Sequence, residues 1–192
     1  PKLMVGPATH LEWWPDVQTQ LLHFFSQHLK GIDNSPSAKR AQFWNITQSC
    51  WQEACTPPAS TWSLQSSGLA CNDPTHGVLQ SDGSGLGMEL IVHDPWRPMP
   101  AIGGHLSPSA GPADRATLAR RTDVATFNTS PLTPELQLFG RPQLSVMAQA
   151  DHPGFDLCVS LSRCIEGADR AEQLSTGVLR VLGKKAQMAL EH

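Results

Sequence analysis

Tyrosine is absent from this chain, and charged residues are scarce. Only 16% of its 192 residues carry a charge, against roughly 25% in average globular proteins. The formal net charge is −3 and there is no run of Lys and Arg, so we expect no nucleic-acid-binding surface. Apolar runs are also short, far below the roughly 20 residues that span a bilayer. We therefore expect no membrane association.

Cysteines are few and odd in number, which excludes complete pairing within one chain. They are Cys50, Cys55, Cys71, Cys158 and Cys164. The Cys50-x4-Cys55 spacing with Cys71 does not complete a zinc site, because no second close pair of Cys or His follows. Free thiols are typical of a reducing compartment. We therefore expect a cytoplasmic protein without a bound metal or cofactor.

A hydrolase nucleophile is missing as well, since the sequence contains no G-x-S-x-G motif. Neither Ser84 nor Ser109 has glycine at both flanking positions of that motif. The glycine-rich segment 81–87 lacks the spacing of a phosphate loop and precedes a predicted strand, which indicates a hairpin loop. The chain by itself is therefore expected to be catalytically inert.

The first thirty residues predict a strand, a loop and a helix. Lys2–Gly6 is a short apolar run that ends at Gly-Pro. Residues 14–30 then place apolar side chains three and four positions apart, as on one helix face: Val17, Leu21, Phe24, Phe25 and Leu29. Pro15 and Asp16 suit the first turn, and Lys30-Gly31 marks the end. This order is half of an α/β unit, which cannot form a parallel sheet alone.

Two segments in the second half of the chain alternate apolar and polar side chains, as in strands with one face on a core. They are residues 144–149 and 155–162. The apolar face of the longer segment consists of Phe155, Leu157, Val159 and Leu161. After Gln173 a last strand is predicted, and its candidates for the core side are Leu174, Val178 and Leu182.

Shorter strands are predicted between the helix and these segments. Their ranges are Gln42–Thr47, Thr61–Leu64, Val78–Gln80, Met88–Val92, Asp123–Thr129 and Leu136–Phe139. Many short strands separated by turn signals, in a chain with 16 Pro and 15 Gly, predict a mainly β fold of β-sandwich type.

Three motifs in order resemble a known family. Residues 94–104 fit D-P-x-x-P-x-P-x-x-G-G, residues 111–115 are G-P-A-D-R, and residues 121–132 fit R-x-D-V-x-x-F-x-T-x-P-L. Together with the strands that follow, they resemble the C-terminal jelly-roll domain of the cocaine esterase and X-Pro dipeptidyl peptidase family. The catalytic domains of that family are α/β-hydrolases with a Ser-His-Asp triad.

The opening of the chain resembles the same family at the point where its catalytic domain ends. Gly6–His10 fits G-P-x-x-H, and Leu29-Lys30-Gly31 ends the helix as L-K-G. The resemblance implies that His10 is the general base, which takes the serine proton and returns it to the leaving group. The serine and the acid would precede residue 1, and the parent protein would act on a small ester or peptide substrate. For this chain alone, the interpretation of His10 as an ordinary loop histidine is preferred.

The resemblance implies two regions. Residues 1–34 would be the C-terminal edge of the α/β-hydrolase domain, and residues 35–192 a jelly-roll sandwich of galactose-binding-like type that lacks its last strands. Residues 103–111 either help to close the substrate pocket or form a plain loop. The chain begins without Met, and we expect a fragment. Unpaired strand edges in such a fragment predict a homo-oligomer.

A second class of function stays open, namely a non-catalytic module that binds carbohydrate or pairs subunits. All six Trp precede residue 97, in the half where the resemblance is weaker. Exposed aromatic rings would favour carbohydrate binding, whereas Trp51 and Trp62 are also explained as core residues of a sandwich.

Overall fold

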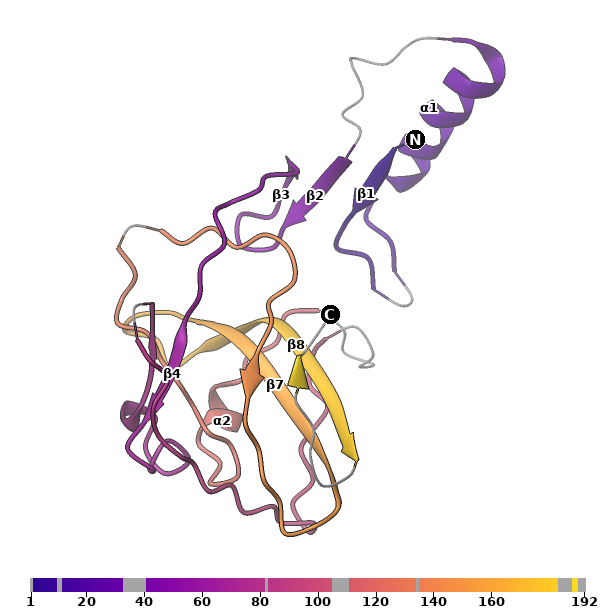
Figure 1. Cartoon of the computed structure of the whole chain (residues 1–192). Helices are drawn as coiled ribbons and strands as arrows, with labels where there is room; N and C mark the ends of the chain where they lie inside the picture. The colour runs from indigo at the N-terminus through magenta and orange to yellow at the C-terminus, as the bar shows by residue number, and fades with distance from the viewer. Residues whose placement is uncertain are drawn as a thin grey trace. The chain divides into compact units, whose positions relative to one another are not determined.

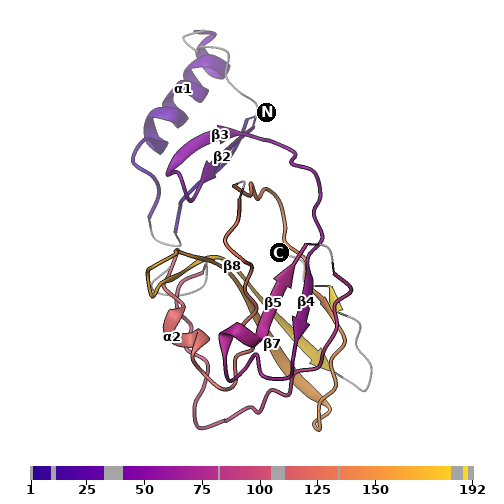
Figure 2. The ribbon, with the colours of Figure 1, turned by 90° about the vertical axis from the view of Figure 1, so that its left-hand side faces the viewer.

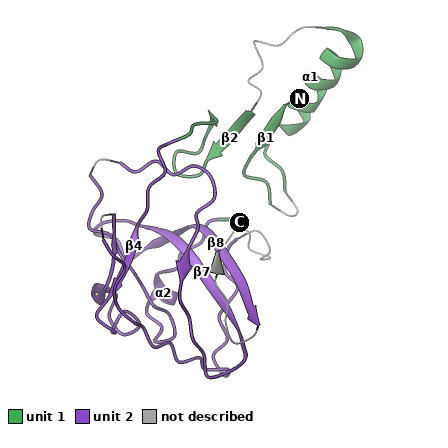
Figure 3. Cartoon of the chain, in the orientation of Figure 1, with its two compact units in different colours: residues 1–56, 105–111 green, residues 57–104, 112–192 purple. Residues whose placement is uncertain are grey.

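The computed structural model describes residues 2–9, 12–32, 41–81, 83–104, 111–133 and 135–182, and the backbone of 188–189. The chain divides into two compact units (Figure 3). The first consists of residues 1–56 and 105–111, and the second of residues 57–104 and 112–192. Strands outnumber helices in the described part of the chain (Figure 1). The predicted mainly β class is therefore confirmed.

The first unit contains a helix and a three-stranded sheet. β1 (Leu3–Val5) leads through α1 (Val17–Lys30) to β2 (Ala41–Asn45), and β1 and β2 pair in parallel. β3 (Cys50–Glu53) pairs with β2 in antiparallel orientation, so the strand order is β1-β2-β3.

Helix α1 begins and ends close to the predicted positions. Asp16 is its N-cap residue, directly after Pro15. Gly31 ends the helix with a left-handed φ of 67°, and its N–H donates to the carbonyl of Ser26. Glycine adopts this conformation without the steric cost that a Cβ atom brings.

The strand predicted at Gln42–Thr47 exists, but its predicted place in the sandwich is wrong. As β2 it lies beside β1, with Leu3 opposite Ala41 and Val5 opposite Phe43. A strand followed by a helix leaves the backbone groups of the strand unpaired until a second parallel strand arrives. β2 is that second strand.

The second unit contains the remaining elements. They are β4 (Ser63–Ser66), the 3₁₀ turn η1 (Pro74–His76), β5 (Gly77–Gln80), α2 (Ala116–Ala119), β6 (Ser145–Val146), β7 (Gly154–Cys164), β8 (Ala171–Leu182) and β9 (Met188–Ala189). β4 pairs with β5 (Figure 2), β6 with β9, and β7 with β8, all antiparallel. The strand predicted at Thr61–Leu64 corresponds to β4 shifted by two residues, and that at Val78–Gln80 to β5.

Three predicted strands do not form, and a fourth is shorter than expected. Met88–Val92, Asp123–Thr129 and Leu136–Phe139 have no strand ladder, and only Ser145–Val146 of the segment 144–149 is a strand. A strand needs a neighbouring backbone as well as a suitable local pattern. Asn128 comes nearest to one, because it forms a single parallel bridge with Val78.

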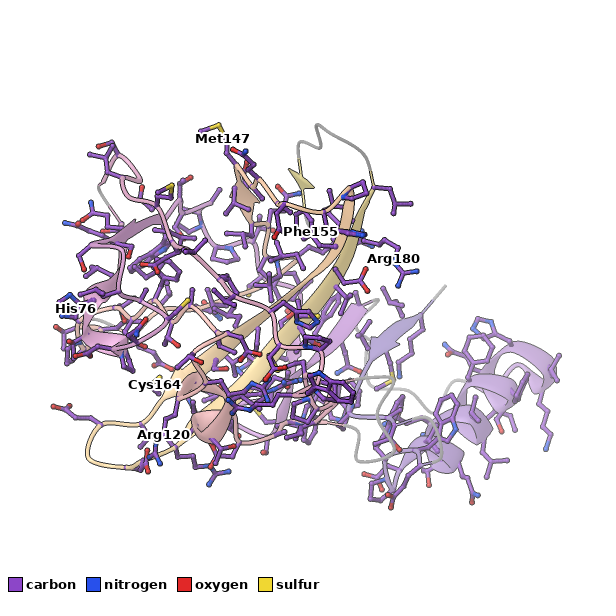
Figure 4. All side chains as sticks on the ribbon, turned by 90° about the horizontal axis from the view of Figure 1, so that it is seen from below. His76, Arg120, Met147, Phe155, Cys164 and Arg180 are labelled. Atoms are coloured by element: carbon purple, nitrogen blue, oxygen red, sulfur yellow. The ribbon has the colours of Figure 1, made fainter. Side chains whose placement is uncertain are left out.

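The core of the second unit lies on one face of the β7–β8 pair. Val181, 6% exposed, packs against Phe155, Leu157 and Val159 of β7 (Figure 4 labels Phe155), and against Leu144 and Leu179. The apolar face predicted for residues 155–161 is therefore confirmed.

The predicted core side of the last strand is wrong. Val178 and Leu182 of β8 are 70% and 74% exposed. In the observed register, Val178 lies opposite the exposed Cys158, while Val181 lies opposite the core residue Phe155. Because side chains alternate across a strand, this register turns the other face of β8 toward the core.

Candidate functional site

His10, the predicted general base, lies outside the described residues. Its neighbours on each side belong to one turn. The N–H of Thr9 donates to the carbonyl of Glu12 at 2.8 Å, and the N–H of Glu12 donates to the hydroxyl of Thr9 at 3.0 Å. The assignment of His10 as a catalytic base stays a prediction.

A cluster of tryptophans follows this turn in the first unit. Trp14 and Trp44 both contact Trp51 edge to face, with ring centroids 5.3 and 5.4 Å apart, and Trp13 lies 5.7 Å from Trp14. A Cβ atom on Gly6 would lie 3.0 Å from the ring of Trp14, and closer still to Trp51. Only glycine therefore fits beneath the rings, so the G-P of the G-P-x-x-H motif serves this packing.

A cavity of about 470 Å³ lies beside the cluster. Its lining residues are Pro7, Thr9, Glu12, Trp13, Trp14, Pro15, Asp16, Trp44 and Trp51. No single sequence motif identifies this set, because Trp44 and Trp51 join it only through the pairing of β2 with β1 and β3. Sequence reasoning therefore missed the cavity.

Asp114 and Arg115 of the G-P-A-D-R motif form hydrogen bonds with backbone groups of the second unit. The carboxylate of Asp114 accepts hydrogen bonds from the N–H groups of Ala116 at 3.0 Å and Ala171 at 3.1 Å. These two bonds hold the pKa of Asp114 below its usual range. The backbone N–H of Arg115 in turn donates to the carbonyl of Ala171 at 2.7 Å. Asp114 thus joins the start of α2 to the start of β8.

Arg115 itself is used as a structural donor. Its Nε donates to Oε1 of Gln173 at 2.6 Å, and its Nη2 donates to the carbonyl of Ile102 at 2.5 Å. Gln173 is only 4% exposed, and burial lowers the pKa of Arg115. The guanidinium therefore links three separate segments inside the second unit.

The Gly-Gly end of the first motif approaches the same region. Gly103 and Gly104 have left-handed φ angles of 65° and 74°. A Cβ atom on Gly104 would lie 3.2 Å from the hydroxyl of Thr176 and 3.7 Å from the side-chain nitrogen of Gln173. The glycines allow this segment to turn closely over β8.

Arg121 and Asp123 of the third motif form an ion pair. Nε and Nη2 of Arg121 donate to the two carboxylate oxygens at 2.7 and 2.6 Å, and Nη2 also donates to the carbonyl of Arg97 at 2.5 Å. Both side chains are little exposed, at 13% and 12%. The bonds from Arg121 hold the pKa of Asp123 below its usual range. Both charged side chains of the motif thus bind other groups of the protein itself.

A small polar cluster near β4 was not expected from the sequence. The carboxylate of Glu89 accepts from the hydroxyl of Ser66 and from the N–H of Ala70. Burial, together with Glu89 and Asp123, raises the pKa of the neighbouring Cys71 thiol. A raised pKa keeps Cys71 protonated and poorly nucleophilic. No spacing in the sequence links these residues, because Ser66 ends β4 while Ala70, Cys71 and Glu89 lie in separate loops before and after β5.

Histidines do not assemble into a site within the described part of the chain. The hydroxyl of Ser67 lies 2.8 Å from Nδ1 of His76 on the surface, but no described acid is hydrogen-bonded to the other ring nitrogen, so the orienting member of a triad is lacking. Nδ1 of His152 lies 2.9 Å from the carbonyl of Gly154. His105 is outside the described residues. Among the residues that are described, no three His, Cys, Asp or Glu gather closely enough to hold a metal ion.

All five cysteines have free thiols, and no described helix is long and apolar enough to span a membrane. The fold and these contacts define a mainly β protein, in which the charged side chains of the three motifs bind other parts of the chain. The chain belongs to the family of X-Pro dipeptidyl-peptidase C-terminal non-catalytic domains, whose model matches residues 9–187. The predicted resemblance to that family is therefore confirmed. Among curated proteins, a sequence comparison finds no match.

Proposed function

We propose that this chain is the C-terminal part of a serine hydrolase that cleaves ester or X-Pro peptide bonds. The family match over residues 9–187 carries the proposal, because the family comprises the non-catalytic C-terminal domains of X-Pro dipeptidyl peptidases. A domain of this kind acts through the catalytic part to which it is attached. The internal use of Arg115, Arg121 and Asp123 agrees with a role that does not involve bond cleavage.

In this proposal, His10 supplies the base of a triad whose serine and acid lie in the catalytic part of the parent protein. The G-P-x-x-H motif that follows β1 supports the assignment. The chemistry is acyl transfer. The imidazole takes the serine proton during attack on the carbonyl and returns it to the leaving group. The substrate is a small ester or a peptide with proline at its second position.

Residues 1–34 are proposed to form the edge of the α/β-hydrolase domain. β1 is an edge strand of its sheet among the described residues, and its Leu3 and Val5 are 53% and 50% exposed. Four apolar residues of α1 are also more than half exposed, namely Leu21, Leu22, Phe25 and Leu29. Apolar surface of this extent is typical of a face that another part of a protein covers.

Within residues 35–192, the second unit (57–104 and 112–192) is proposed to form a jelly-roll sandwich of galactose-binding-like type, whereas β2 and β3 belong to the sheet of β1. The β7–β8 pair supports this, because one of its faces packs on a core while the other carries polar and exposed residues. Sandwich strands show this alternation when one sheet packs on another. Further strands facing Val181 would complete the second sheet.

The proposal is tested on the complete gene product, with the 192-residue chain as a comparison. We expect the complete protein to react with a fluorophosphonate probe and to hydrolyse Gly-Pro-p-nitroanilide and p-nitrophenyl acetate. The 192-residue chain should do neither, because it has no G-x-S-x-G motif to supply the catalytic serine. His10→Ala in the complete protein should lower kcat by about 10³-fold or more, since the serine then loses its base.

His76→Ala is the matched control, because His76 is the histidine of the surface Ser67 pair. It should leave kcat unchanged. Unchanged hydrolysis in the His10→Ala protein, or probe labelling of the 192-residue chain itself, would contradict the proposal.

The alternative is a non-catalytic module that pairs subunits. One observation favours it: the segment 86–96 exposes a series of apolar side chains in the second unit. Leu86, Met88, Leu90, Val92 and Trp96 are 69%, 83%, 78%, 68% and 92% exposed. A surface of this kind is typical of protein–protein contacts.

A further inference from the structure

The tryptophan-lined cavity of the first unit has the size and the lining of a small-molecule site. Its volume of about 470 Å³ lies within the roughly 300–1,000 Å³ of small-molecule sites. All its lining residues belong to the segment 7–51 of the first unit. The site therefore depends on no contact with the second unit.

Aromatic rings form much of its wall. Trp14, Trp44 and Trp51 hold one another in edge-to-face contacts, which fix the orientation of the rings. Trp13 lines the same cavity and is 65% exposed, so its ring is available to a ligand. The faces of indole rings carry negative potential, and tryptophan is the side chain that attracts cations best in this way.

The charged residues of the wall are of one sign. Glu12 and Asp16 both line the cavity, and the described lining includes no Lys, Arg or His. Neither carboxylate has an ion pair with a described residue. Asp16 caps α1 without a side-chain hydrogen bond to its backbone. The positive N-terminal end of α1 is worth about half a charge, so it offsets only part of the two carboxylates.

We propose that this cavity binds the ammonium group of an organic cation. Ring faces and carboxylates both attract cations, and a quaternary or primary ammonium group can interact with both at once. An anion would be repelled by the two carboxylates, and a neutral ligand would gain no attraction between opposite charges from them. The proposal does not depend on hydrolase activity, so it can fail or hold separately.

The test uses the 192-residue chain, with choline as the cation and 3,3-dimethylbutan-1-ol as its neutral isostere. The two molecules have nearly the same shape and differ in charge. We expect choline to change tryptophan fluorescence saturably and to shift indole N–H signals in ¹H–¹⁵N spectra. The isostere should bind at least several-fold more weakly, and added salt should weaken choline binding because part of the attraction is between charges.

Two variants locate the site. Trp13→Leu should raise the Kd for choline by about 2- to 30-fold, the range that one cation–π contact is worth. Glu12→Gln should also raise the Kd, and it should reduce the salt dependence. Trp96→Leu is the matched control, because Trp96 is 92% exposed and belongs to the second unit. It should leave the Kd unchanged.

Circular dichroism establishes that each variant is folded. If Trp13→Leu does not fold, Glu12→Gln tests the site instead, because Glu12 is exposed. Equal affinity for choline and the isostere would overturn the proposal, as would a failure to saturate. Binding of neutral sugars in a glycan titration that competes with choline would overturn it in favour of the carbohydrate-binding alternative.

Discussion

At the scale of residues, the motifs that mark the family consist of side chains that bind the protein's own backbone and polar groups. Arg115 is the central example, because it joins Gln173 to the carbonyl of Ile102. Hydrogen bonds from a charged donor are stronger than those from a neutral donor. If the donor is removed, each buried acceptor loses its partner, which costs further free energy. We therefore expect motif residues to be required for stability.

Arg115→Met keeps most of the aliphatic stem and removes the donors. We expect the free energy of unfolding to fall by about 2 kcal/mol, since buried Gln173 and the Ile102 carbonyl lose charged hydrogen bonds. Urea unfolding followed by circular dichroism measures the change. Arg120→Met is the matched control, because the Arg120–Asp169 pair has side chains 60% and 74% exposed and such pairs contribute little. Equal loss in the two variants would contradict the structural role of Arg115.

At the scale of elements, the register between β7 and β8 decides which face of β8 packs against the core. A bulge lies between Leu161 and Ser162, so the pairing shifts from Leu161 opposite Ser175 to Ser162 opposite Gln173. Both Gln173 and Val181 are buried, whereas Val178 is exposed. The bulge leaves Leu174 of β8 without a partner on β7. Val178 and Val181 both lie on the C-terminal side of Leu174 and three positions apart, so they face opposite ways.

The two valines of β8 provide a matched pair of identical substitutions. Val181→Ala should lower the free energy of unfolding by about 2 kcal/mol, because it removes buried methyl groups and leaves a cavity beside Phe155. Val178→Ala should change it by less than about 0.5 kcal/mol, since the side chain is mostly in water. Chemical denaturation measures both. The reverse order would instead support the core side that the sequence alone predicted, with Val178 facing the core.

At the scale of the whole molecule, each unit exposes apolar surface that a larger protein would cover. In the first unit this surface lies on α1 and β1, and in the second on the segment 86–96. When the 192-residue chain is alone in water, burial of such surface favours contact between copies. We therefore propose that the isolated chain forms homo-oligomers.

Light scattering across a concentration series tests this proposal, and variants assign the face. We expect an apparent mass above that of a monomer, and Leu22→Lys with Leu29→Lys should restore the monomer by placing charges on the exposed face of α1. Met147→Lys is the control, because Met147 is fully exposed and points away from the ribbon (Figure 4). A monomeric mass at all concentrations would contradict the proposal. If Met88→Lys with Leu90→Lys alone restores the monomer, the subunit-pairing alternative is favoured.

Features with a local cause were predictable from the sequence. The end of α1 at Gly31 and the apolar face of β7 follow from the spacing of side chains and from the conformational freedom of glycine. The three ordered motifs were sufficient to predict the family. The candidate base His10 was proposed from G-P-x-x-H in the same way, and it stays a prediction.

Only the tertiary structure decided which strands pair and which side chains face the core. β2 pairs with β1, β8 turns Val181 toward the core, and Met88–Val92 is not a strand, because each outcome depends on a backbone distant in the sequence. The same holds for the cavity, which Trp13 and Trp44 line from different elements. The spacing of residues along one strand does not determine which strand pairs with it or in which register. Neither the register nor the cavity could therefore be inferred without the tertiary structure.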